Sequence, residues 1–270
     1  MRLALDHLTV ADTTPSQLVT VAARIGCPAI CLFLQPMTVL PHLPAFDLYR
    51  ETQERRATLE RMQDSGISLD IAYPFTIAGR SDIGASAAAL ETAAMLDAWG
   101  VNLLVYDRDP NRRADKFAAF CERAGDFGLK VVVEFYPLSQ IRTLGEAVDL
   151  VRGVNAPGRV GVNVDLLHLT RSGDTPASLA AIPPEWILYA QYCDAPAVQE
   201  AMPWDHEASH QRRLAGEGAL DLAGFAAALP EGCRASVELP REDAILAGVE
   251  AIDRASAAVN GVRRAVEGKE

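Results

Sequence analysis

The sequence lacks a surplus of basic residues, a cysteine pattern and a long uncharged apolar run. Its 25 lysines and arginines face 36 acidic residues, a formal net charge of −11. Nucleic-acid binding depends on clustered basic side chains, so this balance disfavours a nucleic-acid partner. The five cysteines are scattered and odd in number, which predicts reduced thiols in a cytoplasmic protein rather than a disulfide framework or a zinc cluster. Neither a signal peptide nor a membrane span is expected, because the first apolar stretch is short and is interrupted by Asp6 and His7, and no uncharged apolar run reaches about 18 residues.

Eight short apolar segments are present, and each is followed by a stretch with helical spacing. The segments cover residues 3–8, 29–34, 68–73, 102–106, 130–134, 160–165, 186–191 and 234–238. Several are nearly continuous in valine, isoleucine and leucine, which is typical of parallel strands covered on both faces. The alternation predicts a (β/α)₈ TIM barrel that forms a single domain over residues 1–270. A doubly wound sheet is less favoured, since no glycine-rich phosphate loop follows the first segment.

Helix boundaries are less evenly marked than the strands. Residues 176–182 are the only stretch available for the helix after the sixth strand, and residues 242–266 predict the longest helix. Two segments that follow strands are long for this fold, namely residues 35–49 and 195–218. Both should lie at the face where barrel enzymes build their active sites.

Four oxygen-bearing side chains end the last four predicted strands. They are Glu134, Asp165, Gln191 and Glu238. The carboxyl ends of barrel strands meet at one mouth, so these side chains should converge. Three converging carboxylates repel one another, and a divalent cation is the simplest way to neutralise them. Oxygen ligands favour Mn²⁺ or Mg²⁺, with Co²⁺ also compatible. The alternative for individual members of the set is an ion pair with an arginine or a supporting role beside the ligands.

Three short motifs stand at or after the ends of the sixth and seventh predicted strands, between Glu134 and Glu238. They read DLLH from Asp165 to His168, QYCD from Gln191 to Asp194, and RRLAGEG from Arg212 to Gly218. In order and placement, these residues resemble the sugar isomerase/epimerase superfamily, the xylose-isomerase-like TIM barrels. The resemblance covers nearly the whole chain. It implies a divalent metal held at positions 134, 165, 191 and 238.

One ligand position departs from the usual pattern of that superfamily. Members commonly carry histidine where this chain has Gln191. A glutamate, aspartate, glutamine and glutamate set is similar to that of bacterial 3-dehydroshikimate dehydratases of this fold. The resemblance therefore favours a dehydratase acting on 3-dehydroshikimate or an inosose. A sugar or sugar-phosphate isomerase or epimerase is the alternative.

The chemistry expected at such a site is proton removal beside a ketone. A divalent cation polarises the carbonyl, and Glu134 or Glu238 can act as base with the other as acid. Reprotonation on the other face, proton relay between carbons and loss of a hydroxyl give three different products, among which the ligands alone do not choose. The substrate would be a small keto-polyol or a cyclic keto acid.

Other candidate residues lie near these strand ends. The resemblance makes His168 a substrate contact and proton donor, and it makes Arg212, with Arg213 as its substitute, a contact for substrate oxygens. Asp194 is expected to support the site or to contact substrate. His7 ends the first strand and either faces the site or serves a structural role.

Two further functions compete with this reading. An endonuclease IV-like repair enzyme shares the fold but needs many histidines, and this chain has five. A barrel without catalysis, acting with a partner chain, is supported only by Gln191. Members of the superfamily often form dimers or tetramers, so a homo-oligomer is compatible with the resemblance.

Overall fold

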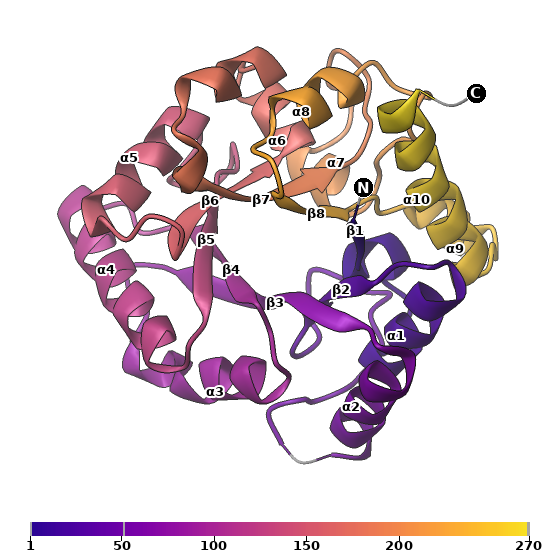
Figure 1. Cartoon of the computed structure of the whole chain (residues 1–270), viewed down its shortest axis with the longest axis horizontal. Helices are drawn as coiled ribbons and strands as arrows, with labels where there is room; N and C mark the ends of the chain where they lie inside the picture. Colours follow the sequence, from indigo (N-terminus) through magenta and orange to yellow (C-terminus); the bar gives the residue numbers. More distant parts are fainter. Residues whose placement is uncertain (1, 51, 269–270) are drawn as a thin grey trace.

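The computed structural model describes residues 2–50 and 52–268. Eight parallel strands close into a barrel in chain order, with the last strand paired to the first. The helices form a ring outside the strands (Figure 1). This is the predicted (β/α)₈ TIM barrel.

The strands follow the predicted apolar segments, except that the third strand continues four residues past its predicted end, to Ile77. They are β1 (Leu3–Asp6), β2 (Ala29–Phe33), β3 (Ser68–Ile77), β4 (Gly100–Val105), β5 (Lys130–Glu134), β6 (Val160–Asp165), β7 (Ile187–Tyr192) and β8 (Arg234–Val237). Nearly every strand residue is buried, because one face of each strand meets the barrel interior and the other meets the helices. Register then aligns the strand ends: Glu134 pairs with Asn163, and Asp165 pairs with Gln191.

The helices that cover the barrel are of uneven length. They are α1 (Pro15–Arg24), α2 (Gln53–Ser65), α3 (Ala87–Met95), α4 (Pro110–Asp126), α5 (Leu144–Val154), α6 (Leu166–Arg171), α7 (Trp204–Ser209), α8 (Leu222–Ala228), α9 (Glu242–Leu246) and α10 (Ala251–Glu267). Within the described residues, no helix has both the length and the apolar character needed to span a membrane.

Two helix predictions differ from the structure. The expected helix over 242–266 is split into α9 and α10, because Gly248 adopts a left-handed conformation with φ of 73° that ends the first segment. The stretch 176–182 forms a 3₁₀ turn (Pro176–Ala181), while α6 begins directly after β6. The Asp165 carboxylate caps α6 by accepting the backbone N–H groups of Leu167 and His168.

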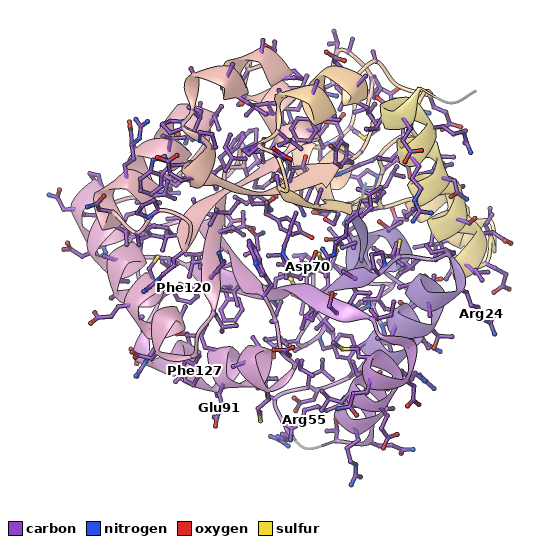
Figure 2. All side chains as sticks on the ribbon, in the orientation of Figure 1. Arg24, Arg55, Asp70, Glu91, Phe120 and Phe127 are labelled. Atoms are coloured by element: carbon purple, nitrogen blue, oxygen red, sulfur yellow. The ribbon has the colours of Figure 1, made fainter. Side chains whose placement is uncertain are left out.

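The opposite end of the barrel is closed by an ionic cluster. Figure 2 shows Asp70 inside the ring of strands, whereas Arg24, Arg55 and Glu91 project from the outer helices. Asp70 is buried and pairs with Arg2 at 2.6 Å and with Arg234 at 2.5 Å. This end is therefore filled by paired charges, and the open space lies at the carboxyl ends of the strands.

Candidate active site

The four predicted oxygen ligands lie at the carboxyl ends of β5 to β8. Glu134 and Asp165 are the last residues of their strands, Gln191 is one residue before the end of β7, and Glu238 directly follows β8. All four are buried. A cavity of about 290 Å³ opens above them, and Glu134, Gln191 and Glu238 form part of its lining. The structure thus brings these side chains to one mouth.

Two asparagines inside the barrel hold the ligands in place. Asn102 of β4 donates a hydrogen bond to the Glu134 carboxylate. Asn163 of β6 donates to the side-chain oxygen of Gln191 at 2.6 Å. The Gln191 amide nitrogen in turn donates to the Glu238 carboxylate. Neither asparagine was predicted from the sequence to belong to the site. Their signal was a polar residue inside an apolar run, in VNLLV and in VGVNVD.

Arg212 lies between two of the carboxylates. Its Nη1 is 2.7 Å from Asp165 Oδ2, and its Nη2 is 3.5 Å from Glu238 Oε1. Nη1 also donates to the Glu238 backbone carbonyl, and Nε donates to the Ala208 carbonyl at 3.0 Å. The Arg212 side chain is only 1% exposed. The predicted arginine therefore reaches the site, where it bridges acidic groups.

The carboxylates of this cluster titrate under opposing influences. Burial raises the pKa of Glu238 well above its usual range, although Arg212 acts in the other direction. Burial is the largest single influence on Asp165 and disfavours its charged form, but the Arg212 guanidinium, His168 and the hydrogen bonds to the carboxylate together hold the pKa of Asp165 below its ordinary value. Glu134 adds to the repulsion that Glu238 experiences. The cluster is short of positive charge.

The donor set fits a divalent cation. Ligand atoms of Glu134, Asp165 and His168 all lie within 4.8 Å of one another. With three carboxylates and one guanidinium, the cluster carries a formal charge of about −2 when its acids are ionised and His168 is neutral. A divalent cation would cancel that charge. The structure adds His168 to the candidate ligands, a role that the sequence analysis had not given it.

His168 also has the geometry of an acid–base group. Its Nε2 lies 3.3 Å from Glu134 Oε1, and its ring packs 4.8 Å from the ring of Tyr136. The backbone of His168 is fixed by the Asp165 cap of α6. Its side chain lines the cavity. An imidazole paired with a carboxylate in a cavity is suited to hand a proton to a substrate oxygen.

Asp194 organises the loop that carries Arg212. Its carboxylate accepts backbone N–H groups from Ala195, Gly216, Gly218 and Leu220 at 2.8 to 3.1 Å. A Cβ on Gly218 would stand 2.2 Å from Asp194 Oδ1, so this close approach requires glycine. Among the two roles expected for Asp194, the structure gives it the supporting one.

Arg213 and His7 have partners outside the cavity. Arg213 is 41% exposed at its side chain and pairs with Glu200 at 2.8 Å. His7 is buried, with Nε2 bonded to the Thr13 carbonyl and Nδ1 accepting the Phe33 N–H. Neither side chain is among the described residues that line the cavity. The structure therefore does not bring these two predicted substrate contacts to the site.

A buried acid beside the site was not foreseen. Asp6, at the end of β1, accepts a hydrogen bond from the Tyr73 hydroxyl at 2.5 Å and from the Leu8 N–H. Its second carboxylate oxygen has no partner among the described residues. Burial raises the pKa of Asp6 to about 7. Tyr73 lines the cavity, so this pair connects the core to the site.

Comparison with known proteins agrees with this architecture. Two solved structures cover nearly the whole chain and show its fold. The IolI protein with a bound zinc atom is 19% identical, with a TM-score of 0.79 over 100% of this chain and 99% of its own. The probable 3-dehydroshikimate dehydratase AsbF of Bacillus anthracis is 16% identical, with a TM-score of 0.73 over 97% and 99%.

Sequence comparison leads to the same group of proteins. The chain is 30% identical over 158 residues to a 3-dehydroshikimate dehydratase of Pseudomonas aeruginosa. The matched segment covers 57% of this chain and 24% of the relative. It therefore spans about a quarter of that relative's length. Residues 19–258 match the family model described as xylose isomerase-like TIM barrel. The chain belongs to the xylose isomerase-like TIM-barrel family.

Proposed function

We propose that this protein is a divalent-metal-dependent lyase that removes a proton beside the ketone of a small polyhydroxylated molecule. The reaction we favour is dehydration of a substrate of the 3-dehydroshikimate or inosose type. One observation carries the proposal. The ends of β5 to β8 gather three buried carboxylates and an amide oxygen beside one cavity, which Glu134, Gln191 and Glu238 line, and Arg212 alone does not balance the charge of the carboxylates.

The metal would be held by Glu134, Asp165, Gln191 and Glu238. The oxygen-rich set favours Mn²⁺ or Mg²⁺, with Co²⁺ also compatible. Bound there, such a cation would polarise the substrate ketone and stabilise the negative charge that develops on its oxygen as the neighbouring proton leaves.

The protein's own side chains would carry the proton transfers. Glu134 or Glu238 takes the proton from the carbon beside the ketone, and both carboxylates line the cavity. His168, 3.3 Å from Glu134, gives a proton to the departing hydroxyl, which leaves as water. Asn102 fixes the orientation of Glu134 through its hydrogen bond. The names of the Pseudomonas relative and of AsbF support a dehydratase.

An isomerase or epimerase acting on a sugar or sugar phosphate is the second candidate. It is favoured by the presence of two glutamates, Glu134 and Glu238, at the same cavity. One would remove a proton from one face of the substrate, and the other would return it to the opposite face. This reaction leaves the hydroxyl groups in place and forms no new double bond in the product.

The experiment follows both outcomes in one assay. The metal-loaded protein is incubated with 3-dehydroshikimate, an inosose and a ketohexose in D₂O, and new ultraviolet absorbance and deuterium incorporation are measured. We expect ultraviolet absorbance from a conjugated product to appear with the wild-type protein. Its rate of appearance should be at least about 100-fold lower in Glu134→Gln and in Glu238→Gln. Glu122→Gln, on the exposed side of α4, is the matched control. Full activity of either site variant would refute the proposal, and deuterium uptake without absorbance would favour the isomerase.

A further inference from the structure

The cavity above the strand ends has two chemically different halves. Every charged group and the histidine in its described lining come from β5 and from the segments that follow β6, β7 and β8: Glu134, His168, Arg212 and Glu238. The half formed by β1 to β4 and their following loops contributes aromatic, aliphatic and neutral polar side chains. Representative members are Phe33, Met37, Tyr73, Phe75 and Leu104.

Arg212, the one guanidinium in the described lining, is already engaged. Its three nitrogens contact Asp165, Glu238 and the Ala208 carbonyl, and its side chain is 1% exposed. To grip a substrate carboxylate, the guanidinium would have to give up ion pairs that compensate buried acids. Breaking such a pair leaves an uncompensated buried charge, which is strongly unfavourable.

The charge of the occupied site leads to the same conclusion. The formal charges of three carboxylates, one guanidinium and one divalent cation sum to zero. A substrate carboxylate would add one negative charge, and Arg212, the one guanidinium in the described lining, is already paired with Asp165 and Glu238. Against the apolar half of the cavity, that charge would also lose its hydration. An uncharged polyol incurs neither cost.

We propose that the substrate of this site is an uncharged keto-polyol, such as an inosose, rather than a keto acid such as 3-dehydroshikimate. Its ketone and neighbouring hydroxyl groups face the β5 to β8 half. Its less polar ring face packs on the aromatic side chains of the β1 to β4 half, a division common in ligand pockets. The inference rests on the proposed function and selects between the two substrate types that it leaves open.

The test compares the two substrate types on the Mn²⁺-loaded protein. The kcat/KM for an inosose should exceed that for 3-dehydroshikimate by about 100-fold, as expected when one substrate buries an unpaired charge. A cation placed in the uncharged β1 to β4 half of the cavity should reduce the difference in kcat/KM between the two substrates. Thr76 lies at the exposed rim of that half. In Thr76→Arg the ratio of kcat/KM for the acid to that for the inosose should rise at least about tenfold.

A control variant and a binding measurement make each outcome decisive. Gln63→Arg, on the exposed face of α2, adds the same charge away from the cavity and should leave the ratio unchanged. A wild-type protein that turns over 3-dehydroshikimate as well as or better than the inosose would overturn this inference and leave the proposed lyase intact. If neither compound reacts, the proposed function fails. In that case the affinities of the protein for the inosose and for 3-dehydroshikimate are measured by calorimetry. Tighter binding of the inosose supports the inference about substrate charge, and equal or weaker binding overturns it.

Discussion

At the scale of single residues, the site is defined by which buried polar groups have partners. Asn102 donates a hydrogen bond to Glu134, and Asn163 donates one to Gln191, which in turn donates to Glu238. The orientation of these three side chains is therefore fixed without a ligand. Residues that orient metal ligands usually matter nearly as much as the ligands themselves. The hydrogen bond from Asn102 to Glu134 is the clearest case, because Asn102 is positioned by β4 and Glu134 by β5.

Replacing Asn102 should weaken the site without unfolding the barrel. In Asn102→Ala, we expect the affinity for Mn²⁺ or the kcat/KM to fall by about 10- to 100-fold, because Glu134 loses the donor that orients it. Titration calorimetry and steady-state kinetics measure the change. Asn260→Ala, on an exposed part of α10, is the matched control. Values within twofold of wild type for Asn102→Ala would contradict the role given to this residue.

At the scale of elements, the loop between β7 and α8 is held by a single carboxylate. Asp194 accepts four backbone N–H groups from this loop, and the loop delivers Arg212 to Asp165 and Glu238. Hydrogen bonds to an ionised acceptor are among the stronger ones in proteins. The order of this loop and the position of Arg212 therefore depend on one side chain.

Removing that carboxylate should loosen the loop first. In Asp194→Ala, we expect faster proteolysis within residues 195–218 and a loss of stability of at least about 2 kcal/mol, because four backbone donors lose a charged acceptor. Limited proteolysis with mass spectrometry locates the cleavage, and urea unfolding gives the stability. Glu217→Ala removes a half-exposed carboxylate that accepts only one backbone N–H of the same loop, that of Leu214, and should change both much less. Equal cleavage of the two variants would count against the role of Asp194.

The elements were more predictable from the sequence than the contacts between them. Short apolar segments, several of them nearly continuous, marked all eight strands, since both faces of a barrel strand are buried. The order of strand ends then placed Glu134, Asp165, Gln191 and Glu238 at one mouth. Long-range contacts left no local pattern. Arg212 bridges from a loop to Asp165 of β6 and to Glu238 just after β8, and Asn102 and Asn163 support the ligands. These contacts arise only when distant segments meet.

At the scale of the whole molecule, two buried groups on neighbouring positions give opposite pH dependences of stability. Burial raises the pKa of Asp6 to about 7, so its contribution is full below its ordinary pKa of 3.8 and is lost as pH rises towards 7. Burial lowers the pKa of His7 to about 4, so its contribution is full above 6.5 and is lost as pH falls towards 4. The two dependences partly cancel in the wild-type protein.

Substituting Asp6 should expose the dependence due to His7. Asp6→Asn keeps a neutral acceptor for Tyr73 and Leu8 at every pH. Relative to wild type, the free energy of unfolding of the metal-free variant should rise between pH 4 and 7 by on the order of a few kcal/mol. Urea unfolding in the presence of a chelator at several pH values measures it. A difference that stays constant over this range, as expected for the exposed control Asp64→Asn, would disprove the assignment.

The central claim is that the barrel mouth is a metal site, and calorimetric titration of the chelator-treated protein with Mn²⁺ tests it most directly. The structure places Asp165 and Glu134 ligand atoms within 4.8 Å of each other in a cluster with surplus negative charge. We therefore expect binding of one ion per chain, with the heat of binding abolished in Asp165→Asn and in Glu134→Gln. Failure of Mn²⁺, Mg²⁺ and Co²⁺ to bind, or undiminished binding in both variants, would contradict the account.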